Sequence, residues 1–128
     1  MLLSDGSAAF GVQSLTATVD TTASGVDDVQ VVRVVQGPAN LYIKTTTFSD
    51  GINVWDLGTI SGPNRVVWEF SANGVAYTTM TAPDSLQPLA AGVPTGGMVS
   101  IYFRLTMPAA TSSTNQHSAT LTVVAVPP

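Results

Sequence analysis

The residues from Met98 to Thr106 (MVSIYFRLT) alternate between apolar and polar side chains more regularly than any other part of the chain. Because successive side chains on a strand point to opposite faces, this alternation predicts a strand with one buried face. Gly96 and Gly97 precede the stretch and Pro108 follows it, so its ends are marked by residues that interrupt strands. We interpret it as the central strand of a β-sandwich, with a core-facing set of Val99, Ile101, Phe103 and Leu105.

Strand and turn patterns fill most of the remaining sequence, and no segment carries a convincing helical pattern. Asn73-Gly74 is a strong hairpin signal, because both residues tolerate positive φ. The segment 82–94, which contains three prolines, is interpreted as a crossover loop. The other predicted strands are residues 12–20, 29–35, 41–47, 52–60, 65–70, 75–81 and 117–126.

About eight short antiparallel strands with regular turn signals predict an all-β fold, a Greek-key β-sandwich. The chain of 128 residues is most simply one domain. We therefore expect a single β-sandwich domain over residues 12–128, preceded by an N-terminal arm or edge strand over residues 1–11.

A resemblance supports this fold. Trp68, in a mid-chain strand, resembles the buried tryptophan of immunoglobulin-like domains, and the runs VVWEFSANGVAYTTM, SIYFRLTMP and ATLTVVA are similar to Ig-like domains of prokaryotic surface and appendage proteins. The similarity covers roughly residues 65–125 and consists of hydrophobicity and turns. It implies an Ig-like β-sandwich at a cell surface. The chain departs from antibody-type domains because it has no cysteine pair.

Charged residues make up 9% of the chain, against about 25% in ordinary globular domains. Either hydroxyl side chains replace charges on the surface, or neighbouring subunits cover much of it. The four cations, which are scattered, predict no nucleic-acid binding, since phosphate recognition needs clustered Lys and Arg. They are Arg33, Lys44, Arg65 and Arg104.

No segment approaches the ~20 apolar residues of a transmembrane helix. Residues 1–11 lack the basic region and long apolar run of a signal peptide. We expect an extracellular or cell-surface location, with a virion component as the alternative.

The residues do not favour catalysis. His117 is the only histidine and there is no cysteine, so a Ser-His-Asp triad or a His-based zinc site is poorly supported, and His117 is expected to be an exposed loop residue. Paired carboxylates can hydrolyse glycosides, but most of the candidates lie at expected turns. These are Asp50, Asp56, Glu69 and Asp84. We expect no enzyme, no catalytic residue and no cofactor.

Asp27-Asp28, with Asp20 nearby, supplies oxygen ligands of the kind that bind calcium. The spacing is not that of an EF-hand loop. A solvated turn is the favoured interpretation, and we predict no metal site.

Two functional hypotheses follow. The first is a structural subunit that self-assembles or decorates a larger assembly by β-strand addition, because unpaired sheet edges recruit strands from other chains. The valine-rich segment 29–35 and the arm support it, the candidate arm residues being Ala8, Ala9, Phe10 and Val12. The alternative is a carbohydrate-binding module whose aromatic platform would use Trp55, Tyr42, Tyr77 and Tyr102. Ordinary cross-strand packing, or burial of Trp55 under the crossover loop, would also explain these aromatic residues.

Overall fold

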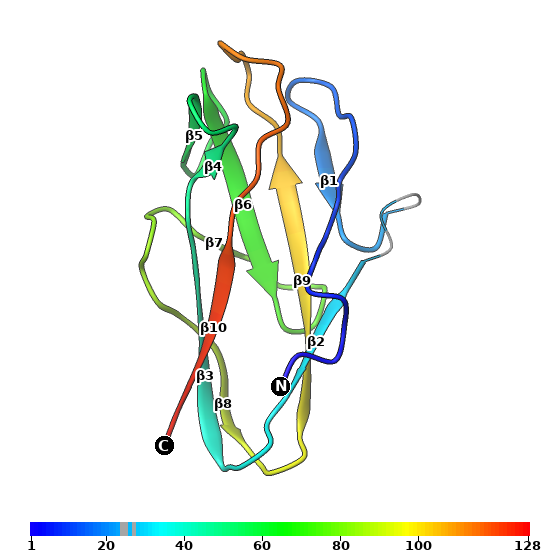
Figure 1. The fold of residues 1–128 in the computed structure, drawn as a ribbon, viewed down its shortest axis with the longest axis vertical. Coiled ribbons are helices and arrows are strands. Elements are labelled where there is room, and N and C mark those ends of the chain that lie inside the picture. Colours follow the sequence, from blue (N-terminus) through cyan, green and yellow to red (C-terminus); the bar gives the residue numbers. More distant parts are fainter. Residues whose placement is uncertain (24–25, 27) are drawn as a thin grey trace.

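A computed structural model describes residues 1–23, 26 and 28–128 of the chain. The protein is all-β and is built from two sheets (Figure 1). The strands in chain order are β1 (Thr18–Asp20), β2 (Gln30–Arg33), β3 (Ala39–Thr45), β4 (Phe48–Ser49), β5 (Val54–Leu57), β6 (Arg65–Ser71), β7 (Thr78–Thr79), β8 (Gln87–Val93), β9 (Met98–Thr106) and β10 (Leu121–Val126).

The larger sheet is organised around β9. Its strand order is β1-β9-β6-β5-β4, with β2 also pairing with β9 and β7 pairing with β6. One edge of β9 pairs with β1 near Thr106 and with β2 near Met98, while the other edge pairs antiparallel with β6, where Trp68 lies opposite Leu105. The interpretation of Met98–Thr106 as a central strand is therefore confirmed, with the predicted boundaries.

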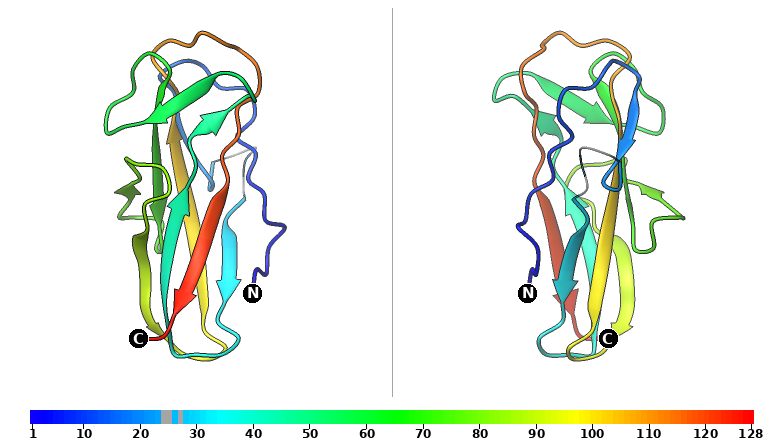
Figure 2. Two further views of the ribbon diagram at one scale, coloured as in Figure 1. Left: turned by 60° about the vertical axis from the view of Figure 1, so that its left-hand side comes forward. Right: turned by 90° about the vertical axis from the view of Figure 1, so that its right-hand side faces the viewer.

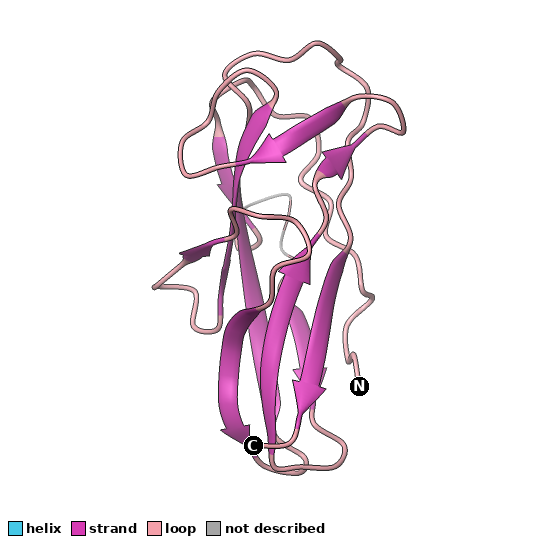
Figure 3. Cartoon of the chain, turned by 90° about the vertical axis from the view of Figure 1, so that its left-hand side faces the viewer, coloured by secondary structure: helices cyan, strands magenta, loops and turns pink. Residues whose placement is uncertain are grey.

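The smaller sheet has the order β10-β3-β8, with both pairs antiparallel. Side views show this sheet lying against the larger one (Figures 2 and 3). The strands β10 and β2 border the same lateral side of the molecule (Figure 2). Two sheets that enclose one core are consistent with a β-sandwich.

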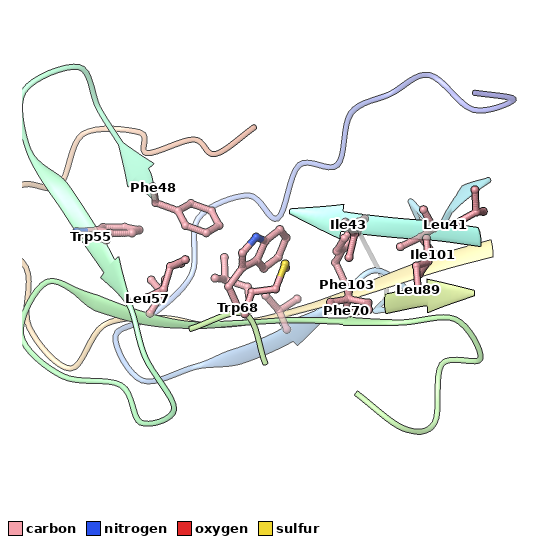
Figure 4. Close-up of a cluster of buried hydrophobic side chains, with 14 of the residues drawn as sticks. Leu41, Ile43, Phe48, Trp55, Leu57, Trp68, Phe70, Leu89, Ile101 and Phe103 are labelled. Carbon is pink, nitrogen blue, oxygen red and sulfur yellow. The ribbon is translucent and has the colours of Figure 1, made fainter. Parts of the chain in front are cut away.

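The core is formed where the inward faces of the two sheets meet. Phe103 and Ile101 from β9 and Ile43 from β3 are almost completely buried, as the alternation predicts. Trp68 lies at the centre, with Phe48 at a ring-centroid distance of 5.1 Å and Phe103 at 5.2 Å (Figure 4). Its indole N–H donates to Thr45 Oγ1 at 3.1 Å. The polar atom of a buried tryptophan is thus satisfied, as burial requires.

Three expectations need correction. The segment 82–94 is not only a loop, because residues 87–93 form β8; Pro88 is tolerated there because β8 is an edge strand, where a missing N–H is not needed. The β5–β6 pair is parallel rather than antiparallel. The predicted strands 12–20 and 75–81 shrink to three and two residues, since the segments beside them fold into turns.

Within the described residues there is no helix long and apolar enough to cross a membrane.

Candidate assembly surface

The N-terminal arm, residues 1–11, begins by pairing with β2. Leu2 lies opposite Val32 in an isolated antiparallel bridge. Leu3 N–H donates to Val31 O at 2.8 Å, and Arg33 N–H donates to Met1 O at 2.7 Å. The arm thus adds a short extra strand to the edge of the larger sheet, on the side that also borders β10 (Figure 2).

Gln30 anchors the next part of the arm. Its side chain is buried, and its Oε1 accepts hydrogen bonds from Ser4 Oγ at 2.5 Å and from Gly6 N–H at 3.1 Å. Its Nε2 donates to Ser7 O at 3.0 Å. Sequence reasoning missed this role, although a single amide in a valine run was the available signal: a polar side chain at an inward position needs partners.

Phe10 is the predicted arm residue with the clearest contact to the core. Its ring meets the edge of Trp68 at a centroid distance of 5.9 Å. Ala8 is half-buried, whereas Ala9 and Val12 are exposed. The four predicted arm residues therefore divide into an anchored pair and two side chains that contribute little to the folded subunit.

The outer edge of β10 is unpaired among the described residues, since β10 ends the smaller sheet. Thr46 N–H donates to Thr120 O at 3.0 Å. Because antiparallel pairs alternate between bonded and non-bonded residues, every second residue from Thr120 onward points its backbone groups toward β3, and the residues between them point away from it. The backbone groups that point to the free edge therefore belong to Leu121, Val123 and Ala125. A template of this kind is what strand addition uses.

An apolar groove of about 380 Å³ lies between this edge and the opposite sheet. Its walls are the side chains of Leu121, Val123 and Ala125 on one side and Val32, Val34 and Val35 on the other, with Leu41 and the arm residues Met1 and Leu2. Arg33 is the one charged residue among the lining residues. The same three β10 residues therefore offer both free backbone groups and apolar side chains.

The proposed aromatic platform is not assembled as a unit. Trp55 is buried at 7% exposure, so of the two interpretations left open for it, burial under a loop describes its position. Its indole N–H donates to Thr111 Oγ1 at 2.9 Å, and its ring stacks on His117 at 3.7 Å and 6°. Tyr42 lies on the outer face of the smaller sheet, whereas Tyr102 lies on that of the larger sheet. Only Tyr77 and Tyr102 share a surface.

That surface carries an ion pair. Arg104 makes a two-pronged contact with Glu69, with Nε to Oε1 at 2.9 Å and Nη2 to Oε2 at 2.7 Å. The guanidinium lies 4.1 Å from the ring centroid of Tyr77. Its hydrogen bond to Glu69 raises the pKa of Arg104, while burial and then the charge of Asp20 raise the pKa of Tyr77. Glu69 lies on the same outer face and is nevertheless buried beneath this cluster.

His117 is half-buried rather than exposed, because its ring packs on Trp55. Its Nδ1 lies 2.7 Å from Asn115 O, while Nε2 is buried without a hydrogen-bond partner in the described part of the chain. Among the described residues, none of the candidate carboxylates forms a hydrogen bond with His117. The structure therefore places His117 in a packing position on Trp55.

Asp50 ties two loops together. Its carboxylate accepts hydrogen bonds from the backbone of Asn53 at 2.6 Å and of Ile52 at 2.9 Å, and from Ser113 Oγ at 2.7 Å. The N–H groups of Asn53 and then of Ile52 hold the pKa of Asp50 well below its ordinary value. Of the other carboxylates, Asp84 pairs with Lys44 at 3.1 Å, and Asp56 lies at an exposed position of β5.

The predicted turn at Asp27-Asp28 lies partly outside the described residues, because Asp27 is not among them. Asp20 accepts hydrogen bonds from Thr22 at 2.8 Å and 2.5 Å, and Asp28 accepts one from Gln30 at 3.0 Å. Asp20 and Asp28 thus take part in separate local contacts.

Comparisons with protein-family models, with curated proteins and with solved structures gave no match to this chain.

Proposed function

We propose that this protein is a non-enzymatic structural subunit that assembles with further copies of itself by β-strand addition. In this proposal the sandwich has an Ig-like, Greek-key arrangement. The assembly belongs to an extracellular or cell-surface structure or, as the alternative, to a virion. The partner is a second copy of the chain, and no catalytic residue or cofactor takes part.

The observation that carries the proposal is the open lateral side, where the free edge of β10 borders the apolar groove. A strand added at this edge would pair with the free backbone groups of Leu121, Val123 and Ala125. Its alternate side chains would enter the groove and remove apolar surface from water, at about 25 cal/mol per Å² buried. Backbone pairing supplies affinity in such additions and the groove supplies selectivity.

The edge also lacks the usual protection against such pairing. Soluble proteins commonly place charged residues, proline or bulges on exposed edge strands. β10 has the sequence LTVVAV, with no charge and no proline. The low charge of the whole chain agrees with a surface that becomes partly covered on assembly.

A matched pair of lysine variants on β10 tests the proposal. Ala125→Lys places a charge on the groove side, whereas Thr122→Lys places the same charge on the outer face; both positions are exposed, so neither change should unfold the subunit. Sedimentation velocity and negative-stain microscopy should show assemblies for the parent chain and Thr122→Lys, and mainly free subunits for Ala125→Lys. Equal assembly by both variants would contradict the proposal, and so would a parent chain that stays monomeric at high concentration.

One observation favours the carbohydrate-binding alternative. Tyr77 and Tyr102 share the outer face of the larger sheet with Arg104 and Glu69, and sugar sites combine aromatic faces with charged hydrogen-bonding groups. However, the guanidinium of Arg104 already covers one face of the Tyr77 ring. Glycan-array binding that is lost in Tyr77→Ala and kept in Tyr42→Ala, a change on the other sheet, would support this function. An array without signal would leave the assembly proposal in place.

A further inference from the structure

The turn that joins the arm to β1 contains a residue poorly suited to its conformation. Ala17 N–H donates to Ser14 O at 3.1 Å, which closes a four-residue turn. Its third residue is Thr16, with φ at 65°. Turns with positive φ at this position usually have glycine there, and a β-branched residue with positive φ is a genuine outlier. The folded-back arm is therefore held against local strain.

The sequence around this turn prefers a different conformation. The alternation over residues 12–20 predicts a strand, yet only Thr18–Asp20 forms one, and Val12 and Leu15 remain exposed. Two hydrogen bonds already continue the β1–β9 ladder beyond Thr18, from Met107 N–H to Ala17 O at 2.9 Å and from Thr16 N–H to Pro108 O at 3.1 Å. Straightening the chain at residues 15–16 would extend β1 and keep the bond from Met107 N–H to Ala17 O. The bond from Thr16 N–H to Pro108 O would be lost, because neighbouring residues of an extended strand point their N–H groups to opposite sides.

A straightened arm leaves its own subunit. In the folded subunit the arm runs beside β1 in the opposite direction, from the end that is uppermost in Figure 1 toward the N-terminus. Opening the turn would send residues 1–15 beyond that end, over about 3.3 Å per residue, or roughly 50 Å in all. The arm's own place on β2 would then be vacant, so a second copy could fill it.

We infer that two copies of this chain exchange residues 1–15 across a two-fold axis at this end, so that each arm occupies the place on β2 of the other copy. The direction of the arm requires this symmetry. A straightened arm leaves its own copy at the upper end, and its place on the second copy also begins at the upper end of that copy. The two upper ends must therefore face each other. The exchange is reciprocal and closed, as in domain-swapped dimers. This inference rests on the proposed function and names its partner as an identical chain.

Every contact of the folded-back arm can be made again by the exchanged arm. These contacts are the bridge between Leu2 and Val32, the hydrogen bonds to Gln30 and the ring contact between Phe10 and Trp68. The exchange therefore relieves the turn and gives up only the turn's own hydrogen bonds, from Ala17 N–H to Ser14 O and from Thr16 N–H to Pro108 O.

The end of the subunit where the copies would meet carries exposed apolar side chains. The loops 11–17, 50–53, 58–64 and 109–117 gather there (Figure 1), held by contacts such as Asn64 N–H to Ala110 O at 2.7 Å. These loops contain Val12, Leu15, Ile52 and Ile60, all exposed in the single subunit. An upper-end contact between two copies would cover them, which suits a second copy as the partner.

Two substitutions at one position should move the exchange in opposite directions. Thr16→Gly removes the penalty of positive φ and should reduce the dimer fraction, by roughly tenfold in the open-to-closed ratio. Thr16→Pro fixes φ near −65° and also favours an extended Leu15. It should raise the dimer fraction, and the bond to Pro108 that it removes is made only in the folded-back form. Sedimentation equilibrium measures the two ratios against that of the parent chain.

The deciding experiment introduces a disulfide between the arm and β2 with the double substitution Leu2→Cys and Val32→Cys. The parent chain has no cysteine, so every disulfide joins two introduced thiols, and peptide mapping identifies those between position 2 of one copy and position 32 of the other. The pair faces across a non-hydrogen-bonded antiparallel position, where Cα atoms lie about 4.5 Å apart, within disulfide range. After oxidation at high protein concentration, non-reducing gel electrophoresis should show a covalent dimer, which reduction returns to monomer.

The outcomes separate this inference from the proposed function. A covalent dimer supports the exchange. Large assemblies whose disulfides are all within single chains would overturn the exchange and leave assembly at the β10 edge standing. Monomers with internal disulfides at every concentration would overturn both. A dimer fraction that is equal in Thr16→Gly and Thr16→Pro would also contradict the exchange.

Discussion

The centre of the larger sheet and the open lateral side of the molecule are built from the same kinds of residue but are organised differently. In β6 and β9, every inward side chain from Ile101 to Leu105 and from Val66 to Phe70 is buried. In β10 the inward residues Leu121 and Val123 are only half-buried and Ala125 is exposed. The apolar side chains of the strands are thus fully packed at the centre of the larger sheet and only partly packed on the lateral side.

The difference lies in the neighbours of each strand. β9 has paired strands on both edges and the smaller sheet across its inner face, whereas β10 pairs only with β3 and faces the groove. Apolar side chains in a groove without a cover are unusual in a protein that works alone. The central strands therefore supply the packed core of the subunit, whereas the lateral side leaves apolar side chains partly exposed, and the proposed assembly depends on that side.

Removing a side chain from the centre should have the largest effect on stability. Trp68 is 3% exposed and contacts three aromatic rings. Trp68→Ala should lower the free energy of unfolding by about 3–5 kcal/mol, because it leaves a cavity and removes the hydrogen bond that Thr45 Oγ1 accepts. Urea denaturation measures the change. A loss below about 1 kcal/mol would mean that the core is not organised around this ring.

The same kind of truncation on the lateral side should separate stability from assembly. Val123→Ala removes two methyl groups from a half-buried position and should cost the free subunit about 1 kcal/mol or less. It should weaken assembly more clearly, because the groove loses part of one wall. Paired urea and sedimentation experiments check this, and the comparison fails if Val123→Ala destabilises the subunit as strongly as Trp68→Ala.

The smallest expected effect concerns the loops at the upper end. Asp50 has a depressed pKa in the folded state, so its contribution to stability is present above the ordinary carboxyl pKa of 3.8 and is lost as the pH falls further. Asp50→Asn should therefore lower the melting temperature at neutral pH, and the gap to the parent chain should narrow below pH 3.8. Calorimetry at several pH values checks this; a gap that does not change with pH would show that the carboxylate charge is not responsible.

The sequence was most informative where one face of a strand is buried. The alternation of Met98–Thr106 predicted both boundaries of β9 and its core-facing side, and Trp68, expected to be buried in a mid-chain strand, is buried. Patterns of this kind work because a shift by one residue would expose the whole apolar set. The all-β class could be predicted for the same reason.

The sequence was less informative where tertiary context decides. Pro88 argued against a strand, but β8 lies at a sheet edge, where proline is accepted. The sequence pattern allowed Trp55 to belong to an outward platform, but in the structure the loop bearing Thr111 and His117 covers its ring. The amide of Gln30 and the turn at Thr16 depend on the path of the arm, which local propensity does not specify.

Hydrogen exchange on the free and the assembled protein tests the central claim most directly. The backbone amides of Leu121, Val123 and Ala125 should exchange quickly in the free subunit and become protected as concentration rises, while amides of β9 stay protected throughout. Protection that appears elsewhere, with these three amides still exchanging quickly in the assembled protein, would contradict assembly at the open edge of β10.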